Sequence, residues 1–503
     1  MPRKPASTRT TALIVAAAMF MEMLDGTVLS TALPAMARSF HADPLNMSVA
    51  LTSYLLSLAV FIPASGKVAD RLGSRTVFAA AIALFTLGSV LCGLSTGLPF
   101  LVAARIIQGI GGAMMVPVGR LVLLRTIPKA ELVSAMAWLL VPATIGPVVG
   151  PPVGGFIVTY LNWRWIFGMN VPIGLAGIVL VLRYIDEIRE PEKRPFDVPG
   201  LGLTAVSLSC LTFGLEMGSR GAASLRVTAA LLAIGVVTGV LYIRHARLHP
   251  DPILDLRLMR IPTFRISVYA GACSRVAAGA MPFLLPLMLQ LGFGMSAVAS
   301  GMITFVSAVG SLLMRVTAQP MLRALGYRRT MIWVGMLATF LFGMTAAFRP
   351  DWPRSAIYGL LLLGGYFQSL QFMAYNTIAY ADIPRERMSA ATSFYTTFQQ
   401  LFLSLGIATS AAALGAAVAI RGNAGPTLPD FSVGFLVVTV VALGAPLVSL
   451  WLAPDAGAEL SGRLPQQVQL LRTRRRGTLR KPIIRSGTHL LWAARQVWRR
   501  RQA

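Results

Sequence analysis

The stretch TALIVAAAMFMEMLDGTVLSTALP, residues 11–34, decides the fold, because it is an apolar run long enough to cross a bilayer. It contains two acids, Glu22 and Asp25, whose spacing of three puts them on one face of a helix. A carboxylate in the middle of a span costs about 2.5–3.5 kcal/mol, so both acids are expected to face a wet cavity or a cation. The pattern favours a helix that lines a path through a membrane, with its acids as candidate proton carriers. The alternative is a structural ion pair inside a helix bundle.

The composition places the whole chain in the membrane class. Of its 503 residues, 55% are hydrophobic and 13% are charged, against roughly 25% charged in an average soluble protein. This excludes a soluble globular protein, and the lack of period-two alternation excludes an outer-membrane barrel. The net charge of +26 points to nucleic acid only in a soluble protein, so we do not expect nucleic acid as a partner. The three cysteines are far apart and the four histidines fall in loops or the tail, so we predict no disulfide, metal site or cofactor.

Apolar stretches recur along the chain, and fourteen of them are long enough for a span. They lie at 11–34, 48–66, 76–95, 98–119, 133–160, 163–185, 200–218, 227–243, 266–290, 297–318, 329–348, 355–380, 389–420 and 432–453. We exclude a cleaved secretory signal, because the first run is too long and contains two acids. Most Lys and Arg residues lie in the connections after even-numbered spans, which predicts a multi-pass membrane protein with both termini cytoplasmic. The other side has only Arg38, Arg164, Arg220, Arg226, Arg349, Arg354 and Arg421.

The connection after the second span reads GKVADRLGSR, residues 66–75. Its pattern G-x-x-x-D-R-x-G-x-R is formed by Gly66, Asp70, Arg71, Gly73 and Arg75. The glycines allow close approach of the chain, and Asp70 can cap a helix or pair with an arginine. The spacing resembles the loop signature of the major facilitator superfamily between its second and third helices. A degenerate copy, LGYR at 325–328, follows the tenth span and predicts a second six-helix unit.

These features predict an all-α polytopic membrane protein with the major facilitator fold. We expect an N-terminal six-helix bundle at 1–190, an inserted helix pair at 191–250, a C-terminal six-helix bundle at 251–454 and a basic cytoplasmic tail at 455–503. Apolar residues recur at helical spacing among the arginines of the tail, which predicts a helix on anionic lipid. A solvated tail without fixed structure is the alternative.

The fifth span contains GPVVGPPVGG, residues 146–155, and should form a kinked, closely packed helix where the two halves rock. The repeat is formed by Gly146, Pro147, Gly150, Pro151, Gly154 and Gly155. It resembles the antiporter motif of the drug-exporting branch of the superfamily, as do LDGTVLSTALP at 24–34, WRWIFGMNVPIG at 163–174 and DPILDLRLMRIPTFR at 251–265. With fourteen spans, the resemblance is to the fourteen-span drug:proton antiporter family, over the chain to about Pro454. Three further features narrow the resemblance to one type of transporter within that family. They are PASGKVADRLG at 63–73, GGAMMVPVGRL at 111–121 and an arginine in the ninth span.

Arg105 lies inside the fourth span, where a guanidinium must be paired or hydrated. Its depth in the membrane differs from that of Asp25 by only about 3 Å at 1.5 Å per residue, so the two can pair. We therefore take Asp25, Glu22 and Arg105 as the proton-coupling residues. Two departures from the family leave the coupling acid open, because Ser30 stands where Asn is frequent and Glu22 is an additional acid.

Arg275 lies in the ninth span, near the midplane, where the repeat places a central cavity. It either neutralises Glu22 or Asp25 or contacts an anionic group of a substrate, for which a guanidinium is suited. Glu216, near the external end of the seventh span, is a cavity residue or only a residue of the mouth. The further candidates for polar contacts in the cavity are Gln108, Gln290, Gln371 and Asn376.

The resemblance implies export of drugs or small amphiphiles in exchange for protons, by rocking of two six-helix halves. The alternative within transport is export of a specific organic anion or a metal-chelate, motivated by Arg275. An alternative of another class is a membrane sensor that binds a ligand without transporting it. We do not expect an enzyme, because no nucleophile, base and orienting group form one recognisable motif. The sequence identifies no partner subunit.

Overall fold

The computed structural model describes residues 8–126, 132–189, 196–219, 224–423, 425–458 and 460. These residues form helices and no strand, so the prediction of an all-α fold is confirmed. Twelve of the described helices are long and apolar enough to cross a membrane. The basic tail from 461 onward lies outside the described residues, and so does the prediction that it forms a helix on lipid.

The first half of the chain holds six long helices. They are α1 (Thr8–Val28), α3 (Ser48–Leu72), α4 (Ser74–Gly93), α5 (Leu98–Thr126), α6 (Leu132–Tyr160) and α8 (Asn170–Tyr184), with a short α7 (Trp165–Gly168) before the last. The regular helix in the first predicted span, 11–34, is shorter than expected. It ends at Val28, passes through a 3-10 turn at Leu29–Thr31 and continues as α2 (Leu33–Ser39). Pro34 lies in the first turn of α2, where its missing N–H is not needed.

The inserted pair is α9 (Val198–Ser219) and α10 (Leu225–Leu248). The second half holds α11 (Pro262–Leu287), α12 (Ala297–Leu325), α13 (Tyr327–Arg329), α14 (Gly335–Met344), α15 (Arg354–Ile378), α16 (Met388–Arg421) and α17 (Leu428–Ser449). Each of the fourteen predicted stretches contains a described helix. Two of these helices, α6 and α15, are not among the twelve. In α6, the segment Ile145–Tyr160 forms a shorter apolar helix. Helix α15 carries polar side chains along its length.

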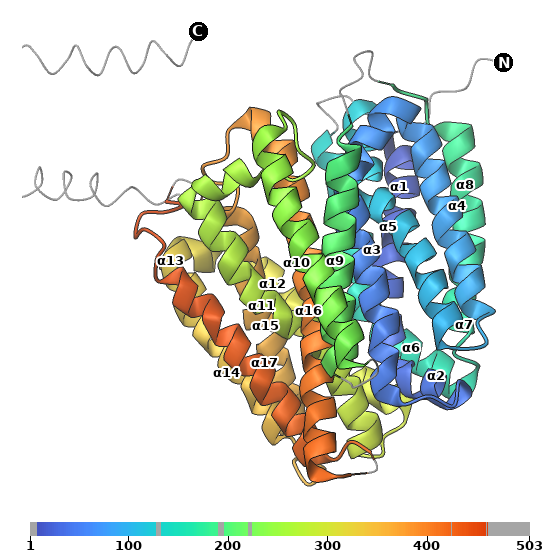
Figure 1. Cartoon of the computed structure of the whole chain (residues 1–503), viewed down its shortest axis with the longest axis vertical. Coiled ribbons are helices and arrows are strands. Elements are labelled where there is room, and N and C mark those ends of the chain that lie inside the picture. Colours follow the sequence, from blue (N-terminus) through green and yellow to red (C-terminus); the bar gives the residue numbers. More distant parts are fainter. Residues whose placement is uncertain are drawn as a thin grey trace, which may run out of the picture.

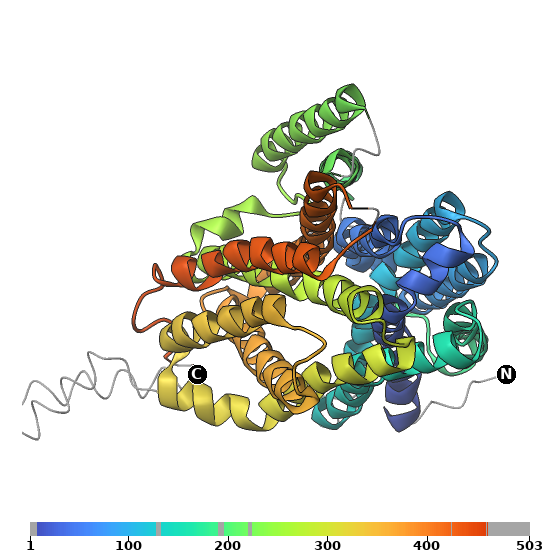
Figure 2. The same ribbon diagram turned by 90° about the horizontal axis from the view of Figure 1, so that it is seen from below.

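Two groups of helices stand side by side (Figure 1), with α1, α4 and α8 on one side and α14 and α17 on the other. The inserted pair lies at the edge of the molecule when it is seen from below (Figure 2). There α9 and α10 pack against each other, and α9 also contacts α3 and α16. The pair therefore rests where the two groups meet.

The contacts between the two groups that involve α6, α11 and α12 are at the end opposite the start of α1. There Gly155 of α6 faces α12 so closely that a Cβ would lie 2.5 Å from the carbonyl oxygen of Ala297. Nearby, Gln290 Nε2 donates to the Thr31 carbonyl at 3.0 Å. Buried apolar side chains from both groups, such as Leu33 and Leu285, form one core cluster at this end. These contacts hold the halves together at this end, and α3 of the first half also packs against α16 of the second.

Candidate functional site

Asp25 and Arg105 form an ion pair in the interior of the first half. Arg105 Nη1 lies 2.5 Å from Asp25 Oδ2, and neither side chain is exposed. The predicted pairing is therefore confirmed. Arg105 also donates from Nε to the Ala50 carbonyl at 3.1 Å, and its guanidinium lies 4.2 Å from the centroid of the Tyr54 ring. Such partners stabilise a buried ion pair by bonding its remaining atoms, although Nη2 of Arg105 has no hydrogen-bond partner among the described residues.

The second oxygen of Asp25 is bound by two side-chain amides. Oδ1 accepts from Gln108 Nε2 at 2.9 Å and from Asn170 Nδ2 at 3.0 Å. Gln108 was predicted as a cavity residue, and the structure places it in the Asp25 cluster instead, where it also bonds Ser89. Asn170 and Tyr54 were missed. A signal for Asn170 existed, since it is the polar residue in the apolar stretch GMNVPIG at 168–174.

Glu22 lies almost one turn before Asp25 on α1 and has a different environment. Its side chain is buried, with 6% exposed, and Oε2 has no hydrogen-bond partner among the described residues. Helix α1 therefore presents one carboxylate that is fully bonded and one that is not. Burial of a carboxylate oxygen without a hydrogen bond costs free energy, and the role of Glu22 as a proton carrier stays a prediction.

Arg275 is the corresponding charge of the second half, on α11. It is 2% exposed, and Nη2 donates to Asn376 Oδ1 at 3.2 Å. Its guanidinium lies 4.3 Å from the centroid of the Phe372 ring and 5.2 Å from that of Tyr395. No carboxylate among the described residues forms an ion pair with it, and Nε has no hydrogen-bond partner there. One of the two predictions for Arg275 was that Glu22 or Asp25 neutralises it. In this structure neither acid forms an ion pair with Arg275.

Of the other predicted cavity residues, two lie close to Arg275. Asn376 binds it directly and also accepts from Gln399 Nε2 at 2.5 Å. Gln371 is one turn before Tyr375 on α15, donates to its hydroxyl at 2.9 Å, and accepts from the hydroxyl of Ser274, the neighbour of Arg275.

Gln290 and Glu216 lie elsewhere. Gln290 joins the two halves through the Thr31 carbonyl, as described above. Glu216 is fully buried between α9 and α3, where its two oxygens accept from the hydroxyls of Ser48 and Thr52, each at 2.8 Å. It therefore attaches the inserted pair to the first half, which a residue of an open mouth would not do.

The connection between α3 and α4 is a tight turn at Gly73, whose φ of 99° favours glycine. A side chain at Gly73 would also collide with the carboxylate of Glu187, which follows α8. That carboxylate accepts from the backbone N–H of Arg75 at 3.2 Å and from the Thr76 hydroxyl, and so caps the start of α4. Asp70 is half-buried in the last turn of α3, while Gly66 and Arg71 are exposed. Glu187 was missed by the sequence analysis.

The glycines of α6 face two different neighbours. A Cβ at Gly146 would lie 3.0 Å from Met23 Cβ, one at Gly150 would collide with the Thr27 hydroxyl, and one at Gly154 would lie 2.5 Å from the Val28 carbonyl. These three therefore pack against α1, whereas Gly155 packs against α12. The predicted close packing of this helix is confirmed, and Pro147 and Pro151 are included in one helix from Leu132 to Tyr160.

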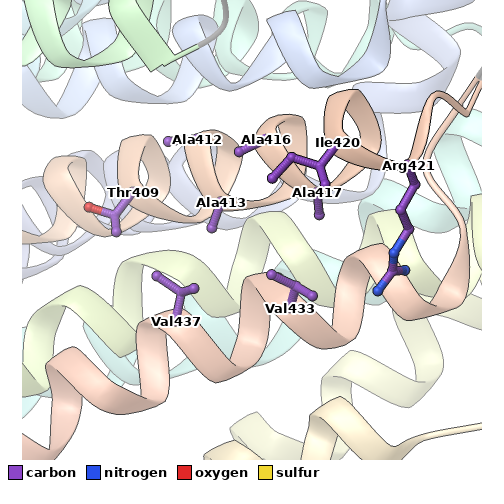
Figure 3. Close-up of a pocket in the computed structure, with 9 residues that line it drawn as sticks. All are labelled: Thr409, Ala412, Ala413, Ala416, Ala417, Ile420, Arg421, Val433 and Val437. Carbon is purple, nitrogen blue, oxygen red and sulfur yellow. The ribbon is translucent and has the colours of Figure 1, made fainter.

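A pocket of about 370 Å³ lies between α16 and α17 (Figure 3). Most of its lining is alanine and valine, and its one charged residue, Arg421, pairs with Asp430 at 3.0 Å. None of the predicted cavity residues lines it, so it does not belong to the site around Arg275.

Comparison with known proteins agrees with this architecture. Residues 15–407 match the family model described as Major Facilitator Superfamily. The chain is 38% identical over 421 residues to "Putative multidrug resistance protein MdtD" of Salmonella typhimurium, covering 82% of this chain and 88% of the relative. It is also 38% identical over 415 residues to the protein of the same name from Escherichia coli O6:H1, covering 82% and 87%. MdtD is the type of transporter to which the sequence resemblance narrowed.

Solved structures share the fold at low sequence identity. A D-xylose–proton symporter superposes with a TM-score of 0.63 at 15% identity, over 90% of this chain and 99% of its own. A bacterial homologue of the human lysosomal transporter Spinster, in an inward-facing conformation, superposes with a TM-score of 0.60 at 14% identity, over 88% and 96%.

Proposed function

Because the chain belongs to the Major Facilitator Superfamily, whose members are transporters and not enzymes, we propose that it exports drug-like small molecules across the inner membrane in exchange for protons. The observation that carries the proposal is the buried pair of Asp25 and Arg105 in a multi-pass fold of this kind. The names of the MdtD relatives support export of drugs.

The pair can couple protons to movement in a simple way. A proton on Asp25 removes its charge and with it most of its attraction for Arg105, whose guanidinium must then find other partners. Asp25 lies on α1, and α1 packs against the glycines of α6. A change in this ion pair can therefore shift α6, the helix that contacts α12 of the other half. Coupling requires only that the two arrangements differ in free energy for the protonated and ionised forms.

The location of the contacts between the halves supports a state open to the cytoplasm. We propose that both termini are cytoplasmic and that the rocking units are residues 1–190 and 251–454, with 191–250 as the inserted pair. The end at which Gly155 meets Ala297 is then the external gate. Proton entry from outside requires this gate to open.

The function is tested with the purified chain in liposomes under an imposed pH gradient, against a panel of lipophilic cations and organic acids. We expect proton-driven movement of at least one class. A ligand that binds to the protein but is not moved, with no compound of either class moved under any gradient, would favour the sensor alternative.

A second candidate function, export of an organic anion or a metal-chelate, is favoured by Arg275. Asp25 is neutralised by Arg105, and among the described residues neither Glu22 nor Arg275 has an ion-pair partner, so no surplus of negative charge there selects for cations. Among the described residues, this buried guanidinium is held by an amide and two aromatic residues and by no carboxylate, so it would gain from an anionic partner.

Replacing Arg275 by Gln separates the two candidates. If the substrate is an anion, Arg275→Gln should lose about 2 kcal/mol or more of binding free energy, about thirtyfold in Kd, because a buried charge pair is broken. If the substrate is a cation or neutral, binding should be unchanged or broader. Binding is measured by scintillation proximity on folded protein, with Arg275→Lys as the matched control that keeps the charge. Failure of Arg275→Gln to fold, with Arg275→Lys folded, would assign the arginine a structural role.

A further inference from the structure

Three metal-binding side chains meet at the base of the inserted helix pair. Asp197 directly precedes α9, while His245 and His249 are one turn apart at the end of α10. One ligand atom from each of the three lies within 4.8 Å of the others. The two imidazole rings have their centroids 5.2 Å apart. The sequence analysis predicted no metal site because the histidines were placed in loops or the tail, and Asp197 is separated from them by the whole length of the hairpin.

The antiparallel hairpin brings these residues together, and local bonds fix the carboxylate. Asp197 Oδ1 accepts from the Gly200 N–H at 2.8 Å, as an N-cap of α9, and lies 2.6 Å from His245 Nε2. Oδ2 accepts from the Ile253 N–H at 3.1 Å. The carboxylate is therefore held in place beside the two imidazoles.

We propose that Asp197, His245 and His249 bind a divalent transition-metal cation of the Zn²⁺ type. Two imidazole nitrogens and one carboxylate oxygen are a donor set that suits Zn²⁺, with water in the fourth position, whereas Mg²⁺ and Ca²⁺ prefer oxygen alone. Two histidines four residues apart lie on one face of a helix and can hold the same ion. When the ion binds, the imidazole of His245 takes the tautomer with its proton on Nδ1, so that Nε2 has a free lone pair and becomes a ligand.

The position of the site gives the cation a structural consequence. Ile253, which bonds Asp197, follows Asp251, and Asp251 pairs with Lys67 at 2.9 Å. Lys67 belongs to the GKVADRLGSR stretch of the first half. A cation at this site would therefore connect both helices of the inserted pair to residues 251–253, which contact the GKVADRLGSR stretch through Lys67.

The site is tested by titrating the purified full-length chain, in detergent and without a histidine tag, with Co²⁺ and Zn²⁺. We expect one Zn²⁺ per chain in calorimetry and a Co²⁺ visible absorption band that Zn²⁺ displaces. Loss of one ligand in His249→Gln should weaken binding about tenfold or more. The side chain of His249 makes one hydrogen bond among the described residues, from the Asp251 N–H at 3.3 Å, so this variant should keep its fold.

The matched control is the double variant His41→Gln/His489→Gln, which removes the other two histidines of the chain and should bind like the native protein. His245→Gln is the second test and should also lose the ion. The proposal is overturned if the native chain binds no Zn²⁺ saturably, or if His249→Gln binds it as tightly as the control does.

Discussion

Export driven by a pH gradient should vanish when Asp25 is replaced by Asn, while the protein still inserts into the membrane. The amide keeps the size of the carboxylate and most of its hydrogen bonds but cannot exchange a proton. In liposomes that contain this variant, the rate of substrate transport under a pH gradient should fall to the rate in liposomes without protein. This is the larger of the two effects that we expect, because it removes the coupling rather than weakening it.

The same change leaves Arg105 buried without its counter-charge, at a cost of about 3–5 kcal/mol to stability. The double variant Asp25→Asn/Arg105→Gln should recover thermal stability but not transport, which separates coupling from folding. Asp43→Asn, at a loop acid that caps a 3-10 turn, is the control and should transport normally. If Asp25→Asn still exports in response to the pH gradient, the role passes to Glu22, and Glu22→Gln in the same assay then becomes the test.

Gly155→Leu should stop transport by holding the two halves apart at the end where they now meet. Its Cβ alone would lie 2.5 Å from the Ala297 carbonyl and 2.9 Å from Val298 Cα, both backbone atoms of α12 that cannot move without the helix. Overpacking of this kind costs about 1–3 kcal/mol, enough to shift an equilibrium between two states roughly five- to 150-fold. A cysteine placed at Gln290 should react faster with an impermeant maleimide added outside.

Two other glycines make the comparison specific. Gly154→Leu meets Val28 and Thr31 within the first half, so it should lower thermal stability instead of changing maleimide labelling. A Cβ at Gly415, in α16, would meet nothing within 4 Å, so we expect Gly415→Leu to behave like the native chain. Normal transport by Gly155→Leu would mean that this contact does not have to form during the cycle.

The helix positions and the Asp25–Arg105 pair could be predicted because both depend on counting along the chain. Apolar length locates a span, and a rise of 1.5 Å per residue gives the depth of a charge within it. The spacing of glycines in 146–155 likewise indicated close packing, although it did not distinguish Gly155, which faces α12, from the three that face α1.

The remaining parts of the site depend on the rotation of helices about their axes and on which helices are neighbours. Asn170 and Tyr54 bind the Asp25–Arg105 pair because α8 and α3 turn those residues inward, and no spacing in the sequence fixes that rotation. Counting residues along the seventh span predicted that Glu216 lies near the external mouth of the cavity. Its burial, however, follows from the packing of α9 against α3. The Asp197–His245 contact required knowledge of how the inserted pair folds back.

The most direct test is to record protons and substrate together, in liposomes that contain the purified chain and start with no pH gradient. A substrate gradient alone should then drive protons in the opposite direction, as followed with an internal pH dye, and Asp25→Asn should show no such proton movement. Substrate movement with no proton flux, or with protons moving in the same direction as the substrate, would contradict proton-coupled export.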